Sequence, residues 1–185
     1  MASSESRLKA YVMHQNLKFA GWFCTLIMTA STSWSADVGA VPKSAAGVSS
    51  DSATQAEVKA AFARFIAGQN AHDASIVSDV LVNSKGFVWA QYGGNSIWGF
   101  DEAMAAFKTA WKGSWHLDPQ LNELRITSVA PGVAVLITPQ LYTDGDPGEQ
   151  PYTVPVRWGG VFVKTASGWR ISAIFITPYP GWGKH

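Results

Sequence analysis

The residues of this chain best suited to proton transfer are His116 and Asp118, which are separated by one residue. An imidazole titrates near neutral pH, so a histidine near a carboxylate can serve as a general acid or base. They lie in the segment Trp115–Pro119, which we expect to connect a helix to a strand and to reach a pocket mouth. The alternative is a solvated connection in which Asp118 starts a turn before Pro119. His116 and Asp118 are therefore candidate catalytic residues, with a structural turn as the competing interpretation.

A second histidine–aspartate pair, His72 and Asp73, lies at the junction of two expected helices. Aspartate is a preferred N-cap residue, because its carboxylate accepts hydrogen bonds from the free backbone N–H groups of the first turn. We therefore predict that Asp73 caps the second helix and that His72 fills a polar corner.

Familiar metal, phosphate and cofactor motifs are missing from the sequence. The four histidines have no metal-ligand spacing, and the acidic segment 144–149 lacks the regular oxygen series of a calcium loop. No phosphate-binding loop, dinucleotide-binding glycine motif or serine nucleophile elbow is present. We expect no metal and no cofactor, and we predict a hairpin tip at 144–149.

The first 35 residues have the pattern of a secretory signal peptide. A basic residue precedes the apolar stretch 19–30, which is shorter than the roughly 20 residues that span a bilayer, and small residues follow it. The expected cut is after Ser35, a cut after Ala36 ranks second, and translation starts at Met1 or Met13. We therefore predict a periplasmic or secreted protein; an uncleaved membrane anchor is the alternative.

The remaining sequence predicts one domain with short extensions. We expect residues 36–53 to be a flexible linker, 54–179 the folded domain and 180–185 a tail. Residues 1–35 contain three of the 14 basic and one of the 13 acidic residues, so the rest carries a net charge near −1. A chain without excess positive charge does not attract the phosphate backbone of a nucleic acid, so we do not expect nucleic acid as a partner. The only cysteine, Cys24, lies in the signal segment, which excludes a disulfide from the processed chain.

Three helices are expected in the N-terminal half of the domain. Thr54 and Glu57 have capping-box spacing before apolar residues at helical intervals. A second helix should start at Asp73. A third should have Asp101 as its N-cap and should end at Gly113.

The rest of the domain has the pattern of strands. Two short segments flank a glycine turn, and four long segments follow them: 87–92 and 97–98, then 121–129, 133–142, 152–164 and 169–177. The turn at 165–168 predicts three facing pairs: Phe162 with Ile171, Gly160 with Ala173, and Trp158 with Phe175. A small pair between two large pairs would leave a notch in the sheet surface.

The domain is unusually rich in aromatic residues, and some of them are expected to line a hollow. Strand alternation and the Gly160 notch select five candidates: Tyr92, Trp98, Trp158, Phe162 and Phe175. Such a wall suits a flat apolar or aromatic ligand with few polar anchors. The alternative is that these side chains serve core packing and dimer contacts.

The order of elements, together with the segments AGQNAHDASIV and WGFDEAMAAF, resembles the SnoaL-like branch of the nuclear transport factor 2 superfamily over residues 54–179. The resemblance implies an α+β cone: a curved antiparallel sheet, three N-terminal-half helices packed on its concave face, and a pocket between them. It also implies frequent homodimerisation through the sheet. It does not imply one function, because this fold carries isomerases, cyclases, dehydratases and non-catalytic binding domains.

Ketosteroid-isomerase-like members of that superfamily need a carboxylate base, a tyrosine and a second acid. The positions that correspond are Ala90, Phe65 and Gly160, so isomerase chemistry of that kind is not expected. Three hypotheses remain. The first is an exported small-molecule-binding domain, which requires a vacant pocket. The second is an enzyme acting through His116 and Asp118. The third is a non-catalytic dimerisation or interaction module.

Overall fold

The structure is a computed structural model that describes residues 52–91 and 96–179. The predicted signal segment, nearly all of the predicted linker, Tyr92 and the predicted tail lie outside these ranges. No helix within them is both long and apolar enough to cross a membrane.

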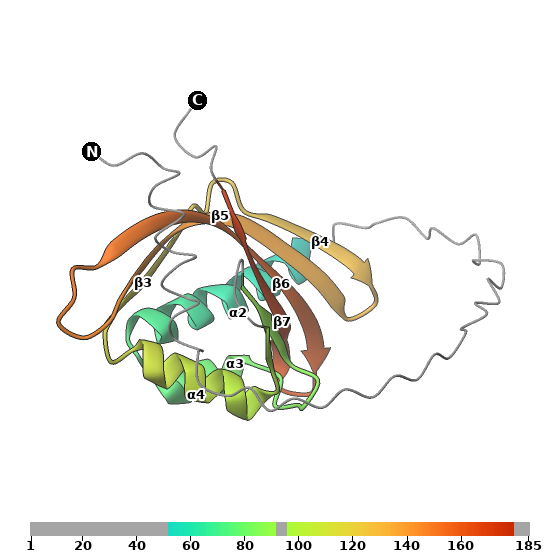
Figure 1. Cartoon of the computed structure of the whole chain (residues 1–185). Coiled ribbons are helices and arrows are strands. Elements are labelled where there is room, and N and C mark those ends of the chain that lie inside the picture. The colour runs from blue at the N-terminus through green and yellow to red at the C-terminus, as the bar shows by residue number, and fades with distance from the viewer. Residues whose placement is uncertain (1–51, 92–95, 180–185) are drawn as a thin grey trace, which may run out of the picture.

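The described residues form three helices and a seven-stranded curved sheet (Figure 1). The helices are α2 Ser52–Asn70, α3 Ala74–Val80 and α4 Phe100–Ala110. The strands are β1 Val88–Ala90, β2 Ile97–Trp98, β3 Ser114–Pro119, β4 Arg125–Ala130, β5 Val133–Gly145, β6 Tyr152–Thr165 and β7 Gly168–Pro178. The sheet bends over the helices, which pack on its concave face, so the predicted α+β cone is confirmed.

The strand order is β2-β1-β7-β6-β5-β3, and β4 also pairs with β5. The pairs are antiparallel except that β1 runs parallel to β7, so the sheet is mixed rather than wholly antiparallel. The chain leaves β1 and β2 through helix α4, crosses to the far side of the sheet and returns as β7 beside β1. Leu81 already makes a parallel bridge to Ile171 before β1 begins.

A β-bulge changes the predicted register of β6 and β7. Phe162 faces Ile171 as expected, but the pairing shifts between Val161 and Phe162. Beyond the bulge, Gly160 faces Ile174, Gly159 faces Phe175 and Trp158 faces Ile176. A one-residue slip moves each following side chain to the other face of a sheet. The pairs predicted for Gly160 and Trp158 are therefore wrong, and Phe175 lies on the outer face.

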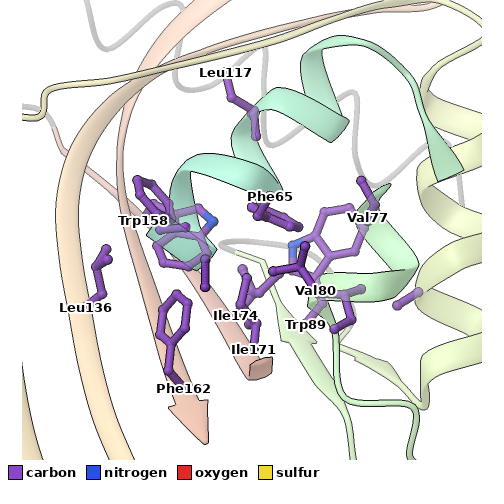
Figure 2. Close-up of a cluster of buried hydrophobic side chains, with 14 of the residues drawn as sticks. Phe65, Val77, Val80, Trp89, Leu117, Leu136, Trp158, Phe162, Ile171 and Ile174 are labelled. Atoms are coloured by element: carbon purple, nitrogen blue, oxygen red, sulfur yellow. The ribbon is translucent and has the colours of Figure 1, made fainter. Parts of the chain in front are cut away.

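Trp158 fills the centre of the core. Its ring centroid lies 4.8 Å from that of Phe62, 5.9 Å from Phe65 and 6.3 Å from Phe162, and Figure 2 shows the last two beside it. A Cβ atom on Gly160 would lie 2.3 Å from Cη2 of Trp158. The notch predicted at Gly160 is therefore present, but the indole of Trp158 occupies it.

The helix starts follow local capping chemistry. Asp73 caps α3 as predicted, accepting hydrogen bonds from the backbone N–H groups of Ser75 (2.8 Å) and Ile76 (3.2 Å). The Ser75 hydroxyl, followed by these N–H groups, lowers the pKa of Asp73. Helix α2 begins at Ser52, two residues before the predicted start. Helix α4 begins at Phe100 after Gly99, whose φ is 93°, so the prediction that Asp101 is its N-cap is wrong.

Candidate functional site

An apolar pocket lies between the concave face of the sheet and helices α2 and α4. Six aromatic residues contribute to its lining: Phe65, Trp89, Phe107, Trp115, Tyr142 and Trp158. Its inner volume is about 20 Å³, whereas a volume of about 360 Å³ includes open solvent at its mouth. This inner volume is enough for about one water. The side chains therefore nearly close the pocket in this conformation.

The aromatic wall is held by ring-to-ring contacts. Trp89 stacks on Phe107 at 4.3 Å between centroids, and Trp115 meets Tyr142 edge-on at 5.0 Å. Trp115 also meets the edge of Phe107 at 6.2 Å. Such tilted and offset pairs are favourable for aromatic quadrupoles. They give the pocket a fixed wall drawn from β1, β3, β5 and α4.

Gln69, in the last turn of α2, places a polar group in this wall. It is fully buried, and its Oε1 accepts a hydrogen bond from Nε1 of Trp111 at 3.2 Å. Its Nε2 has no partner among the described residues. Because the oxygen is engaged by Trp111, the amide is oriented and its N–H₂ group is left to the pocket that Gln69 lines.

The end of α2 is fixed to β3 by side chains next to Gln69. The amide of Asn70 donates to the carbonyl of Leu117 (2.9 Å) and accepts from its N–H (2.8 Å). His72, whose φ of 54° ends the helix, has Nε2 3.3 Å from the carbonyl oxygen of Trp115. His72 is exposed at this junction, so it contacts the predicted polar corner without filling it. These bonds position Gln69 against the strand that carries Trp115.

Two other polar atoms of the lining also have no partner in the described part of the chain: Nε1 of Trp115 and Oε1 of Gln140. Trp115 is 8% exposed and Gln140 is 1% exposed. The great majority of buried polar groups in proteins are hydrogen-bonded, so each exception requires an explanation. Here three exceptions, including Nε2 of Gln69, belong to residues of one pocket.

His116 and Asp118 do not face this pocket. They belong to strand β3 rather than to a loop, and both are exposed, alternating with the buried Trp115 and Leu117. Because successive strand residues point to opposite faces, the inward positions go to the two apolar residues. The expectation that His116 and Asp118 reach the pocket mouth is wrong.

The five predicted ligand-binding aromatics are not brought together. Trp158 lines the pocket, whereas Phe162 is buried beneath it in the core. Phe175 is 43% exposed on the outer face and Trp98 is 64% exposed in β2. Tyr92 lies outside the described residues. The β-bulge explains Phe175, and the short edge strand β2 leaves Trp98 without a covering layer.

The lining contains no aspartate, glutamate, lysine, arginine or histidine in the part of the chain that the structure describes. The positions considered for isomerase chemistry carry no acid either. The same residues contain no cluster of three or more potential metal ligands. What the site can do chemically is to bury an apolar group and to offer neutral hydrogen bonds.

A bent sheet over three helices, with an apolar pocket between them, defines this chain as an α+β cone protein. Within that class it belongs to the SnoaL-like domain family, whose sequence pattern matches residues 58–175. No curated protein matches the sequence significantly.

Solved structures support the fold assignment. A nuclear transport factor 2-like superfamily protein from Salmonella enterica serovar Typhimurium LT2 superposes with a TM-score of 0.61 at 18% identity, over 72% of this chain and 98% of its own. An uncharacterised protein with a cystatin-like fold from Caulobacter vibrioides gives 0.56 at 15% identity, over 66% and 87% of the two chains. At such identities the similarity concerns the fold alone.

Proposed function

We propose that this protein binds a small apolar, cyclic ligand in the pocket between the sheet and the helices. The observation that carries the proposal is the set of three buried, unpartnered hydrogen-bonding atoms, on Gln69, Trp115 and Gln140, in an otherwise apolar aromatic wall. Small-molecule sites typically combine a mostly apolar lining with a few such polar groups. Since the pocket is nearly closed, side chains at its mouth must move when a ligand enters.

The enzymatic alternative is less well supported. A general acid or base must come within hydrogen-bond reach of the reacting atom. His116 and Asp118 lie on the opposite face of β3 from the pocket-lining Trp115 and Leu117. A SnoaL-like reaction through this pair would therefore need a second site on the outer face.

Mass spectrometry of the natively purified protein tests the binding proposal. We expect a cyclic apolar compound to be released on denaturation. Ile176→Trp should reduce its recovery at least about tenfold, because the half-buried Ile176 lines the pocket and an indole there would obstruct it. Thr177→Trp is the matched control, since Thr177 is exposed on the other face of β7. Equal recovery from both variants would place the compound elsewhere.

We infer, second, that the protein is a homodimer that associates through the outer face of the sheet. Ile137 and Phe175, each 43% exposed, lie in one row across β5, β6 and β7 with Gly159 between them. Val135, Val161 and Ala173 form the adjacent row. An apolar face of this kind suits a self-complementary two-fold contact.

Sedimentation analysis tests the dimer. Phe175→Glu should convert the protein to a monomer at micromolar concentration, because a carboxylate would be buried at the contact. Leu121→Glu, at an exposed apolar position outside the strands of this face, should leave the dimer intact. A monomeric unmodified protein would contradict the inference.

We also propose that the protein is exported to the periplasm or secreted. The support is the charged, apolar and small-residue pattern of residues 1–35. N-terminal sequencing of the protein from the extracytoplasmic fraction should give a chain that begins at Ala36. A chain that keeps residues 19–30 would favour the membrane-anchor alternative.

A further inference from the structure

The pocket has polar groups but no charge. The polar side chains of its described lining belong to Tyr142, to tryptophans and to glutamines. The glutamine amides carry no charge. Burying an isolated charged group without a partner costs far more than burying a neutral group that finds a hydrogen bond. An occupant of this pocket is therefore uncharged.

Two of the unpartnered atoms are N–H donors on adjoining elements. Nε2 of Gln69 comes from the end of α2 and Nε1 of Trp115 from β3. The bonds of Asn70 to Leu117 and the contact of His72 with Trp115 hold these two elements together. Gln69 cannot turn its amide to present an acceptor without losing its bond to Trp111. Both unpartnered donors therefore belong to residues that line the same pocket.

The third atom, Oε1 of Gln140, serves a different part of the pocket. Trp115 pairs with Asp144, whereas Gln140 pairs with Pro119, four register positions further along β3 and β5. At about 3.3 Å per residue, the two backbone positions are roughly 13 Å apart along the strands. The side chains of Trp115 and Gln140 thus start from different positions along the strands, although both line the same pocket.

We propose that Gln69 and Trp115 together bind the carbonyl oxygen of a neutral aromatic ligand. This inference rests on the proposed ligand-binding function and adds the ligand class and the residues that recognise it. A carbonyl oxygen accepts two hydrogen bonds and has no hydrogen to place, whereas a hydroxyl would also require an acceptor.

Three probes of nearly the same shape test the inference. Acetophenone carries the carbonyl, α-methylstyrene replaces its oxygen with CH₂, and benzoate adds a negative charge. They are titrated into the natively purified chain with ¹⁵N-labelled indoles, and the Nε1–H resonance of Trp115 is followed. We expect acetophenone to shift this resonance and to bind at least about tenfold more tightly than α-methylstyrene, because the hydrocarbon leaves two buried donors unpaired. Benzoate should not compete.

Variants of Gln69 and Trp115 test whether these residues cause the preference for acetophenone over α-methylstyrene. Gln69→Met should reduce the preference for acetophenone to about twofold or less while α-methylstyrene still binds. Gln55→Met is the matched control, because Gln55 lies in the first turn of the same helix and outside the pocket lining; it should keep the preference. Trp115→Phe, which keeps an aromatic ring and removes the N–H, provides a second variant if Gln69→Met is unstable.

The outcomes separate this inference from the broader proposal. Equal affinity for acetophenone and α-methylstyrene, or binding of benzoate as tight as that of acetophenone, overturns the carbonyl assignment and leaves ligand binding intact. Absence of binding by both neutral probes overturns the carbonyl assignment and leaves a buried water as the partner of the two donors, while the mass spectrometry described above decides the ligand-binding proposal.

Discussion

Trp158→Ala is expected to lower the free energy of unfolding by about 3–5 kcal/mol, which is the range for removing a large aromatic side chain from a packed core. Trp158 is 1% exposed and contacts the rings of Phe62, Phe65 and Phe162. Its loss leaves a cavity that three neighbouring rings cannot fill without leaving their own contacts. Urea unfolding followed by circular dichroism measures the change.

Trp98→Ala is the matched control for this prediction. The substitution is chemically the same, but Trp98 is 64% exposed in the short strand β2. We expect a loss below about 1 kcal/mol, as for surface substitutions in general. Comparable losses in the two variants would contradict the assignment of Trp158 as the central core residue. If Trp158→Ala is folded, its enlarged pocket should admit a larger hydrocarbon than the unmodified protein does.

The fold was largely predictable because its signals are local. Apolar residues at helical spacing gave α2, and an aspartate before the next helix gave the cap at Asp73, which the structure confirms. The glycine-containing turns separated the long strands correctly. The parallel pairing of β1 with β7 was not predictable in the same way, because it joins segments that are far apart in the chain.

The site was less predictable because it depends on which face each strand residue occupies. Because of one extra residue at the β6–β7 bulge, Ile174 and Ile176 lie on the inner face where Phe175 was predicted. Assigning Trp115–Pro119 to a loop hid the alternation that directs Trp115 and Leu117 inward and His116 and Asp118 outward. Assigning this segment to a strand would have revealed the alternation.

Gln69 and Gln140 were missed for a different reason. A glutamine in a helix or a strand is ordinarily an exposed residue, and neither carries a recognisable catalytic or metal-binding motif. Only their burial and unpartnered atoms mark them. A sequence signal exists for Gln140, because it alternates with Thr138 and Tyr142 on the inward face of β5. That pattern of polar side chains inside a buried strand is itself unusual.

Gly160→Ala is expected to destabilise the protein by about 1–3 kcal/mol, the usual range for overpacking a core. The new Cβ atom would lie 2.3 Å from Cη2 and 2.7 Å from Cζ3 of Trp158, and 3.3 Å from Phe162. Trp158 is buried among rings, so its indole can move only by entering the pocket or by separating β6 from α2. Either movement should also weaken ligand binding.

Gly159→Ala, in the adjacent position of β6, isolates this steric effect. Its Cβ would face outward and come no closer than 3.7 Å to the carbonyl oxygen of Phe175, which is ordinary contact. Alanine also loses less backbone entropy than glycine on folding, so we expect stability to be unchanged or slightly raised. Thermal unfolding and acetophenone titration of the two variants compare them directly. If both alanines are tolerated equally, the indole of Trp158 is not fixed over Gly160, and the closed pocket described above is one of several conformations rather than the state that a ligand must open.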